Sequence, residues 1–355
     1  MKGLILAGGK GTRLRPLTFT RAKQLIPISN KANLVYVVED LRNAGITDIA
    51  VIVGDTADEV QAALGTGNTW GVNFHYIPQA QPLGLAHAVA TARDFLADDP
   101  FVMYLGDNLL SGGIGHLVDD YHSGAQHSHI LVTPVRNPRD FGVAVLGEND
   151  EILRLLEKPA DPPSDLALVG VYLFTPQIHA IIADLKPSAR GEYEITEAIQ
   201  GLVDVGAKVK AHRVRGWWKD TGKPEDLLDA NRLVLSTMLG RIEGSVEDSH
   251  ISGEVVLEPG AVVRRSELRG PIHIAQGACI EDSYIGPYTS IGKDVQVRSS
   301  EVEYSILLDD SVIEHLPYRL DASVLGQGVR VRTTPSQRRK NSIRLVLGDR
   351  SDVEL

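Results

Sequence analysis

The sequence has almost no cysteine and no long apolar run. Cys279 is the single cysteine among 355 residues, so no disulfide can form within the chain, and we expect a small buried side chain there. No segment approaches the about 20 apolar residues of a membrane-spanning helix. The apolar run LILA at residues 4–7 is too short for a signal peptide. These absences predict a cytoplasmic protein without a membrane partner.

Positive charge is also in short supply. The chain has 36 Lys and Arg against 46 Asp and Glu, a formal net charge of -10 and a pI of about 5.6. An acidic chain without a long basic run speaks against nucleic acids and membrane surfaces as partners, because both are anionic. The short run QRRK at 337–340 is most simply solvated surface. Single Lys and Arg side chains can still hold a small phosphate ligand.

The residue pattern changes near residue 240, which divides the chain into two parts. Two domains are expected for a length above the about 150 residues of one domain. Residues 1–230 alternate apolar runs with helical stretches, which predicts an α/β domain with a mixed, mostly parallel sheet over residues 1–240. The apolar runs are GLILA (3–7), DIAVIV (48–53), VNFHYI (72–77), FVMYLG (101–106), HILVTPV (129–135), GVAVL (142–146) and GVYLF (170–174). Ligands of such sheets bind beyond the carboxyl ends of the strands.

From about residue 245, aliphatic residues recur every six positions. They fall at Val256, Val262, Leu268, Ile274 and Ile280, slip by one to Ile285, and resume at Ile291 and Val297. A period of six indicates a β-helix over residues 241–355, in which each short face places one aliphatic side chain inside a stacked prism. A β-sandwich with chance spacing is the alternative. We expect the tail from Pro335 to form a loop and a final capping strand.

The stretch LILAGGKGTRLRPLT at residues 4–18 joins a strand to glycines and arginines. A Walker-type loop is excluded, because Thr12 and Arg13 stand after Gly11 where that loop needs a lysine. A dinucleotide-binding fingerprint is half complete, with Gly9 and Gly11, and Pro16 stands where its helix should run.

A turn for a nucleoside triphosphate is the third interpretation. Backbone N–H groups from Gly8 to Thr12 can line a nest around phosphates. Arg13 then offers a bidentate fork, and Lys23 a point charge, for the pyrophosphate leaving group. A tight turn with surface cations remains the alternative for this segment alone.

GGKGTRLRPLT (8–18) with KQLIPI (23–28) resembles the signature of the sugar-phosphate nucleotidyltransferases, most closely the long-form glucose-1-phosphate thymidylyltransferases. The likeness covers essentially the whole chain, including LGDRSDVEL at 347–355, although Ala22 and Ala32 replace two usual prolines. It implies a Rossmann-like nucleotidyltransferase domain followed by a left-handed parallel β-helix. It also implies Mg²⁺-dependent formation of dTDP-glucose and pyrophosphate from dTTP and glucose 1-phosphate, the first step of deoxysugar biosynthesis.

Two carboxylates follow strand-like runs. Asp107 and Asn108 end FVMYLGDN, and Asp220 stands in WWKDTGKPED. Carboxylates at strand ends can hold Mg²⁺ against phosphate oxygens, although an ordinary turn aspartate explains either residue alone. The resemblance implies that Asp107 and Asp220 are the metal ligands, with Asn108 beside the substrate.

Three further segments are candidates for the sugar phosphate. In LRLLEKPADPP, Lys158 can hold the phosphate and Glu157 can accept hydrogen bonds from hydroxyls. Taken alone, this pair is typical of solvated side chains at the edge of a loop. In RDFGVAVL, the resemblance places the Gly142 backbone against the sugar. In GEYEITEAIQ, Glu194 is a candidate hydroxyl contact, but Thr196 and its neighbours can equally begin a helix.

IPQAQPLGLAHAV at 77–89 resembles the base-recognition segment. The Gln79 amide pairs an acceptor with donors, as the O4 and N3–H edge of thymine requires, and Gly84 would let the base approach the backbone. Uracil has the same edge without the methyl group, so a discrimination of only ~1–3 kcal/mol and some use of UTP are expected.

Two groups of residues are not assigned to the site. His122, His127 and His129 in HSGAQHSH have neither a cysteine nor a fixed ligand spacing, so we interpret them as surface. Trp217 and Trp218 could stack on a base, but we expect one of them to pack in the core.

Other functions remain open at this stage. The chain could be a uridylyltransferase or act on another sugar 1-phosphate, because no motif fixes the sugar. A β-helix can carry an acyltransferase site, for which the repeats offer only His250, His273 and His315, without a recognisable acyl-carrier site. A non-catalytic regulatory subunit would usually have lost a phosphate or metal ligand. We favour a stabilising, regulatory or oligomer-forming β-helix, and expect a homo-oligomer.

Overall fold

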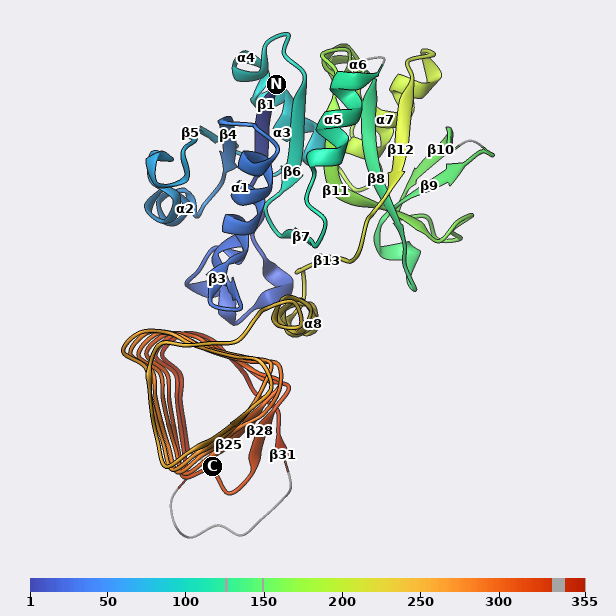
Figure 1. The fold of residues 1–355 in the computed structure, drawn as a ribbon. Helices are drawn as coiled ribbons and strands as arrows, with labels where there is room; N and C mark the ends of the chain where they lie inside the picture. The colour runs from blue at the N-terminus through green and yellow to red at the C-terminus, as the bar shows by residue number, and fades with distance from the viewer. Residues whose placement is uncertain (125–126, 149, 334–341, 355) are drawn as a thin grey trace. The chain divides into compact units, whose positions relative to one another are not determined.

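The protein is represented by a computed structural model that describes residues 1–124, 127–148, 150–333 and 342–354 (Figure 1). The chain forms two compact units, each built from two segments. The sheet unit comprises Met1–Lys10 and Asn33–Asp220, and the prism unit comprises Gly11–Ala32 and Thr221–Leu355. The first residues of the glycine-rich turn thus belong to one unit and the rest to the other. The boundary expected near residue 240 stays a prediction.

The sheet unit contains a nine-stranded mixed sheet with the order β10-β9-β11-β6-β1-β4-β5, extended by β8 on β11 and β12 on β8. The strands are β1 (Lys2–Leu6), β4 (Asp48–Val53), β5 (Asn73–Pro78), β6 (Phe101–Leu105), β8 (Ser128–Pro134), β9 (Gly142–Leu146), β10 (Ile152–Glu157), β11 (Leu166–Phe174) and β12 (Val209–Arg213). Strand β1 pairs in parallel with β4 on one side and β6 on the other. The strand order therefore reverses at β1, and in open α/β sheets ligands bind beyond the carboxyl ends of the strands at such a position.

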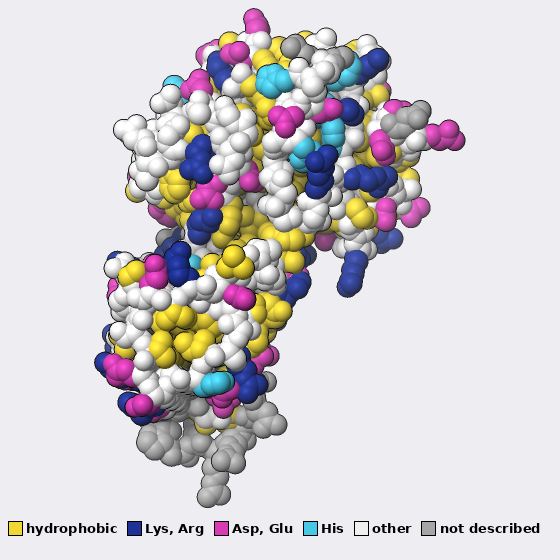
Figure 2. Space-filling view, viewed as in Figure 1, with side chains coloured by type: hydrophobic (Ala, Val, Ile, Leu, Met, Phe, Trp, Pro, Cys, Tyr) yellow, Lys and Arg dark blue, Asp and Glu magenta, His cyan; other side chains and the backbone are white. Residues whose placement is uncertain are grey.

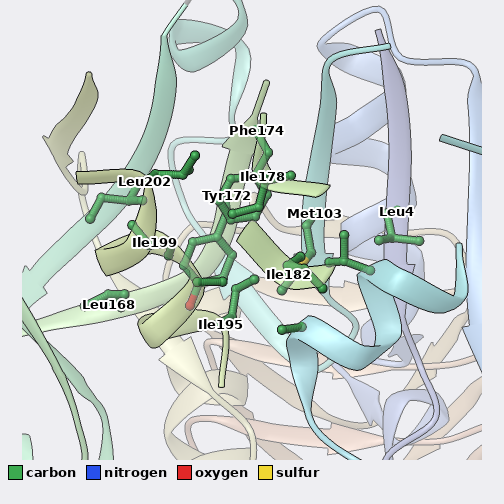
Figure 3. Packing of buried hydrophobic residues seen from close by; sticks show 14 of the residues in the cluster. Leu4, Met103, Leu168, Tyr172, Phe174, Ile178, Ile182, Ile195, Ile199 and Leu202 are labelled. Carbon is green, nitrogen blue, oxygen red and sulfur yellow. The ribbon is translucent and has the colours of Figure 1, made fainter. Parts of the chain in front are cut away.

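Helices cover the sheet and bury its apolar faces (Figure 1). They are α1 (Asn33–Asn43), α2 (Ala57–Leu64), α3 (Leu85–Thr91), α4 (Arg93–Leu96), α5 (Gly115–Ser123), α6 (Ile178–Asp184) and α7 (Ile195–Asp204). Every residue of β11 is buried. Helix α7 places Ile195, Ile199 and Leu202 on one face, at the spacing of successive turns, and this face packs around Tyr172 of β11 (Figure 3).

The prism unit contains three parallel sheets, one for each face of a β-helix (Figure 1). The first consists of β14 (Arg241–Ile242), β17 (Val255–Leu257), β20 (Ile272–Ile274), β23 (Thr289–Ile291), β26 (Ile306–Leu307), β29 (Val324–Leu325) and β32 (Val346–Leu347). The second consists of β15 (Ser245–Glu247), β18 (Val262–Arg264), β21 (Cys279–Glu281), β24 (Gln296–Arg298), β27 (Val312–Glu314), β30 (Arg330–Arg332) and β33 (Asp352–Glu354). The third consists of β16 (His250–Ser252), β19 (Glu267–Arg269), β22 (Tyr284–Ile285), β25 (Glu301–Glu303), β28 (Arg319–Asp321) and β31 (Ser342–Ile343). The predicted fold class, an α/β sheet domain followed by a left-handed parallel β-helix, is confirmed.

The interior of the prism corrects the predicted phase of the repeat. Leu257 pairs with Ile274, and Ile274 with Ile291, so one coil takes 17 residues, the separation that also relates Ser249 to Ser266. The predicted slip before Ile285 is therefore a shorter face that recurs in successive coils. Leu257 and Val263 fill the core at the first two positions, in place of the predicted Val256 and Val262.

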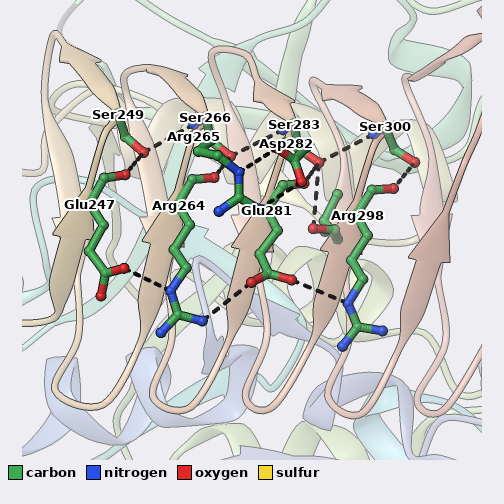
Figure 4. Close-up of polar contacts among 11 residues, drawn as sticks. Glu247, Ser249, Arg264, Arg265, Ser266, Glu281, Asp282, Ser283, Arg298 and Ser300 are labelled. Carbon is green, nitrogen blue, oxygen red and sulfur yellow. Dashed lines mark hydrogen bonds and ion pairs between the residues drawn. The ribbon is translucent and has the colours of Figure 1, made fainter.

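Polar side chains are stacked in register along successive coils of the prism (Figure 4). Backbone N–H groups of Ser266, Ser283 and Ser300 donate to the hydroxyl of the serine one coil earlier, at 3.0, 3.1 and 3.2 Å. Beside this stack, Arg264 lies between Glu247 at 3.0 Å and Glu281 at 3.3 Å. The serine hydroxyls satisfy backbone N–H donors at the corners of the coils. Each exposed ion pair adds little to the stability of the fold.

Two smaller predictions about this unit need correction. Cys279 on β21 is half-buried rather than buried, and burial raises the pKa of its thiol. The tail contributes three strands, β31 to β33, rather than one capping strand. The run QRRK at 337–340 lies outside the described residues.

A buried carboxamide joins three parts of the prism unit. Asn231 lies on α8 (Pro224–Leu235) and is fully buried. Its Oδ1 accepts hydrogen bonds from the backbone N–H of Ser29 at 2.8 Å and from the Ser290 hydroxyl at 2.7 Å, and its Nδ2 donates to the Tyr288 carbonyl at 3.0 Å. Ser29 belongs to the turn between β2 (Pro27–Ile28) and β3 (Lys31–Ala32). This hairpin is thereby tied to α8 and to the β-helix.

The segment 11–32 has further contacts with the coils of the prism. Asn30 Nδ2 donates to the Ile291 carbonyl at 2.9 Å. The Thr20 hydroxyl donates to Asp349 at 2.8 Å, and Arg21 Nη2 to Gln327 Oε1 at 2.7 Å. The segment that carries Arg13 and Lys23 is therefore held by the β-helix along much of its length.

Among the described helices, none combines the length and apolar character needed to cross a bilayer.

Replacing Asn231 with alanine should destabilise the protein. The change removes three hydrogen bonds and leaves buried donors and acceptors without partners, so we expect the free energy of unfolding to fall by about 2–4 kcal/mol. Urea denaturation measures this value. The control is Asn43→Ala, which removes an exposed side chain on α1 and should change stability by less than about 0.5 kcal/mol. Equal effects of the two variants would contradict the proposed importance of the buried carboxamide.

Candidate functional site

The turn after β1 begins at the carboxyl edge of the sheet. The Ala7 N–H donates to the Ile52 carbonyl at 2.8 Å, and the chain then leaves the sheet at Gly8 and Gly9. A Cβ on the neighbouring Gly54 would lie 2.8 Å from the Gly8 carbonyl oxygen, so the two backbones are in close contact. Gly8 and Gly9 therefore lie where the strand order reverses.

The second half of the turn, from Gly11 on, belongs to the prism unit. Gly11 has a φ of +61°, a region that favours glycine, and a Cβ there would lie 2.9 Å from Lys23 Cβ. The Thr18 hydroxyl donates to the Gly11 carbonyl at 2.7 Å. Thr12 and Arg13 begin a short 3-10 helix (Thr12–Leu14), and their side chains are exposed. The sequence thus brings Lys23 against the turn that presents Arg13.

The two candidate metal ligands lie at a pair of antiparallel strands, one directly before the first strand and the other at the end of the second. Asp107 follows β6 and is 7% exposed. The next strand, β7 (Asn108–Leu110), pairs with β13 (Trp218–Asp220), and Asp220 stands opposite Asn108. Two carboxylates brought to neighbouring backbone positions offer the oxygen ligands that Mg²⁺ prefers, so the donor set fits this ion.

Asn108 organises this corner of the sheet unit. Its Oδ1 accepts from Trp218 Nε1 at 2.7 Å and from the Gly170 N–H at 3.3 Å, and its Nδ2 donates to Asp107 Oδ1 at 3.2 Å. Trp217 and Trp218 are both half-buried, so the expected core packing of one of them is wrong. Trp218 instead orients Asn108, and through it the carboxylate of Asp107.

The candidate sugar residues form one cluster at the ends of β9 and β10. Gly142 stands opposite Glu157 in the strand register. Glu157 Oε2 accepts from the Thr196 hydroxyl at 2.6 Å, and its Oε1 from Arg190 Nη1 at 3.1 Å. Lys158, with a φ of +39°, places its Nζ 3.7 Å from Glu157 Oε1. A non-glycine residue held in this region stores strain, which is more common at functional sites than elsewhere.

Arg190 extends the cluster to Glu194. Its Nη1 lies 3.3 Å from Glu194 Oε1, which also accepts a hydrogen bond from the Ser188 hydroxyl at 2.8 Å. Glu194 is 4% exposed, and this burial raises the pKa of its carboxyl group. The sequence interpretation missed Arg190, and it gave Thr196 only a role at the start of a helix. GEYEITEAIQ begins directly after Arg190, which is the signal that could have been followed.

The candidate base residues lie after β5. Gln79 Nε2 lies 2.8 Å from His87 Nδ1, and because the amide nitrogen is a donor, His87 accepts at Nδ1 and carries its proton at Nε2. Gly84 has a φ of +107°, and a Cβ there would lie 2.5 Å from the Tyr193 carbonyl oxygen. Contact with the Tyr193 backbone is thus sufficient to require glycine. The sequence did not predict a role for His87, although this residue lies within the segment 77–89.

The histidine cluster needs a correction. His122 is exposed, as expected, but His129 lies on β8 and is 1% exposed. Its Nδ1 is 2.8 Å from Nε2 of His212 on β12. The surface interpretation failed because it considered only residues close in sequence.

Comparisons with known proteins agree with the resemblance read from the sequence. A family model described as nucleotidyl transferase matches residues 2–237. Glucose-1-phosphate thymidylyltransferases of Streptomyces griseus and Streptomyces antibioticus are each 49% identical, over 100% of this chain and 99% of each relative. A crystal structure of a candidate glucose-1-phosphate thymidylyltransferase from Bacillus anthracis, in complex with a sucrose, is 36% identical. It covers 68% of this chain and 98% of its own, with a TM-score of 0.63. The chain therefore belongs to the nucleotidyl transferase family.

Proposed function

We propose that the protein is a Mg²⁺-dependent glucose-1-phosphate thymidylyltransferase that forms dTDP-glucose and pyrophosphate. The observation that carries this proposal is the 49% identity, over the full length, to two relatives with that name. The charged residues on which the resemblance depends are all present: Arg13, Lys23, Asp107, Lys158 and Asp220.

The reaction is an in-line displacement at phosphorus. An oxygen of the glucose 1-phosphate attacks the α-phosphorus of dTTP, and the bond from that phosphorus to the β-phosphate oxygen breaks. Pyrophosphate leaves with the electron pair of that bond. No residue needs to act as a covalent nucleophile, because positioning and charge neutralisation supply most of the catalysis of such transfers.

Each charged residue has a separate part in this reaction. Arg13 binds the triphosphate with its fork, and Lys23 stabilises the charge that gathers on the leaving pyrophosphate. Lys158 holds the attacking phosphate. Asp107 and Asp220 hold Mg²⁺, which when bound would neutralise charge on the phosphate oxygens. The contact of Asn108 with Asp107 supports this role, because it fixes one carboxylate.

Substrate recognition depends on two hydrogen-bonded pairs. His87 and the Gly84 carbonyl hold the amide nitrogen of Gln79 at 2.8 and 3.5 Å, so that the amide carbonyl can accept a hydrogen bond from N3–H of thymine. Thr196 fixes the carboxylate of Glu157 so that it accepts hydrogen bonds from glucose hydroxyls. Gly142 and Glu194 lie beside this second pair, and Gly8, Gly9, Gly11 and Thr12 supply backbone donors to the phosphates.

The remaining predictions belong to the same proposal. Residues 1–240 would be the catalytic domain and residues 241–355 the β-helix domain of a cytoplasmic homo-oligomer. An acyltransferase in the β-helix is less well supported, since His273 is occupied by hydrogen bonds to Ser29 and Glu258 at 3.0 and 2.9 Å. A regulatory subunit is disfavoured by the intact set of charged residues.

Pyrophosphate release with Mg²⁺ tests the proposal. The assay crosses dTTP, UTP, CTP, GTP and ATP with the 1-phosphates of glucose, mannose, galactose and N-acetylglucosamine. We expect the fastest turnover with dTTP and glucose 1-phosphate, and slower use of UTP. Preference for another pair would contradict the assigned substrates, and no release with any pair would favour the regulatory subunit.

Replacing Asp107 with asparagine should abolish most activity. The substitution keeps the size of the side chain but removes a negative ligand, so we expect kcat to fall at least about a hundredfold with little change in thermal stability. Asp98→Asn, at an exposed position that pairs with Arg93, is the control and should keep wild-type activity. An active Asp107 variant would show that this carboxylate does not hold the catalytic metal.

Two further substitutions should affect different substrates. His87→Ala frees the Gln79 amide, so kcat/KM for dTTP should fall about tenfold while the KM for glucose 1-phosphate stays unchanged. Thr196→Val frees the Glu157 carboxylate. It should lower kcat/KM for glucose 1-phosphate and leave the KM for dTTP unchanged. Steady-state kinetics with each substrate varied in turn measure both, and each variant is the control for the other. The same pattern in both variants would indicate structural damage rather than positioning.

A further inference from the structure

Three side chains with metal-binding atoms meet in the sheet unit away from the proposed catalytic residues. They are Asp120 on α5, His129 on β8 and His212 on β12. Strands β8 and β12 are parallel neighbours, with His129 opposite Lys210. Because alternate residues of a strand share a face, Lys210 and His212 both lie on the face of His129, and α5 adds Asp120.

The three ligand atoms form a triangle of suitable size. His129 Nδ1 lies 2.8 Å from His212 Nε2, and these atoms lie 3.6 and 3.5 Å from Asp120 Oδ2. A tetrahedral ion with bonds of about 2.0–2.1 Å separates its ligands by about 3.3 Å. Opening the pair of nitrogens by about 0.5 Å would therefore produce one face of such a tetrahedron.

Both imidazoles have a lowered pKa, which favours the neutral form that binds metals. Burial lowers the pKa of His129 to about 4 and also lowers the pKa of His212. In the described part of the chain, His129 Nε2 is buried without a hydrogen-bond partner, and so is Nε2 of His116, whose ring lies 6.2 Å from that of His212.

The cluster is also accessible to a small ion. The side chain of His212 is 16% exposed and that of Asp120 34% exposed. Figure 2 shows histidine side chains at the surface over the region where Figure 1 draws α5 and β8, among acidic and basic side chains. Lys210 Nζ lies 2.8 Å from Asp120 Oδ2, and its side chain is 52% exposed, so it can swing away from the carboxylate.

We propose that Asp120, His129 and His212 form a second metal site, which binds Zn²⁺ or a similar transition metal, with water as the fourth ligand. Two imidazoles and one carboxylate select such ions over Mg²⁺, which prefers oxygen. The ion would link α5 to β8 and β12 and stabilise the sheet unit by binding to the folded state. It takes no part in the nucleotidyl transfer, so the proposal does not depend on the substrates assigned above.

Binding of Zn²⁺ and Co²⁺ to the purified full-length chain tests the site. Titrations are made with excess Mg²⁺, which occupies oxygen-only sites. We expect one Zn²⁺ per chain by calorimetry, a visible Co²⁺ spectrum typical of tetrahedral nitrogen ligands, and a higher Tm with Zn²⁺. No binding under these conditions, or a Co²⁺ spectrum typical of octahedral oxygen ligands, would overturn the proposal.

Substitutions locate the ion. His212→Gln and Asp120→Asn leave the buried His129 in place and should each weaken Zn²⁺ binding by more than about a hundredfold, since even partners of metal ligands contribute 10–100-fold. The matched control is His75→Gln, because His75 also faces a carboxylate, Asp48 at 2.9 Å, but is exposed. Loss of binding in this control, or its retention in the two site variants, would contradict the assignment.

Lys210→Met gives a prediction of opposite sign. Removing the ammonium group that competes for Asp120 should strengthen Zn²⁺ binding by up to about fivefold. Weaker binding would contradict this prediction, because it would mean that Lys210 positions the Asp120 carboxylate and that the ion does not take the place of the ammonium group. The Tm of each variant without metal shows whether the fold is intact.

Discussion

The hydrogen bonds of one buried side chain join the β2–β3 hairpin and α8 to the coils of the prism unit. The carboxamide of Asn231 satisfies donors and acceptors from the β2–β3 hairpin and from the β-helix at the same time, and it does so without solvent. The free-energy cost of removing an amide from water is offset only when all its hydrogen-bond partners are in place. It therefore specifies a single arrangement of α8, the hairpin and the coils.

This arrangement assigns a structural task to the β-helix. The hairpin ends the segment 11–32, whose phosphate-binding candidates would otherwise lie on a long irregular loop. Loops of this kind have low local stability unless other elements hold them. The contacts of Thr20 with Asp349 and of Arg21 with Gln327 tie the segment to the last coils. A β-helix that bears no chemistry of its own can thus still be needed for catalysis, because it fixes the conformation of the segment with the cations.

The sequence predicted those features that depend on local pattern. The aliphatic period was sufficient for the β-helix, but not for its phase at Val256 and Val262, because each is followed by a second aliphatic residue and spacing alone cannot choose between them. Strand ends likewise indicated Asp107 and Glu157. The residues that orient them came from distant parts of the chain: Thr196 is 39 positions from Glu157, and Trp218 is 110 from Asn108. His87 lay inside a quoted segment, but its contact with Gln79 depends on how α3 follows the loop.

The same distinction between local pattern and strand pairing separates the two ion sites that we propose in the sheet unit. The Mg²⁺ site that we propose, at Asp107 and Asp220, has oxygen ligands beside the ends of paired strands, where a hydrated ion can bring phosphates with it. The second site that we propose instead takes His129 and His212 from one face of β8 and β12, where burial lowers the pKa of both imidazoles. Ligand chemistry then favours a different metal at each proposed site, since imidazole nitrogens suit Zn²⁺ and similar ions whereas sites of oxygen alone suit Mg²⁺. Strand register, rather than any short motif, creates the second environment, because residues 83 positions apart become neighbours only when the two strands pair.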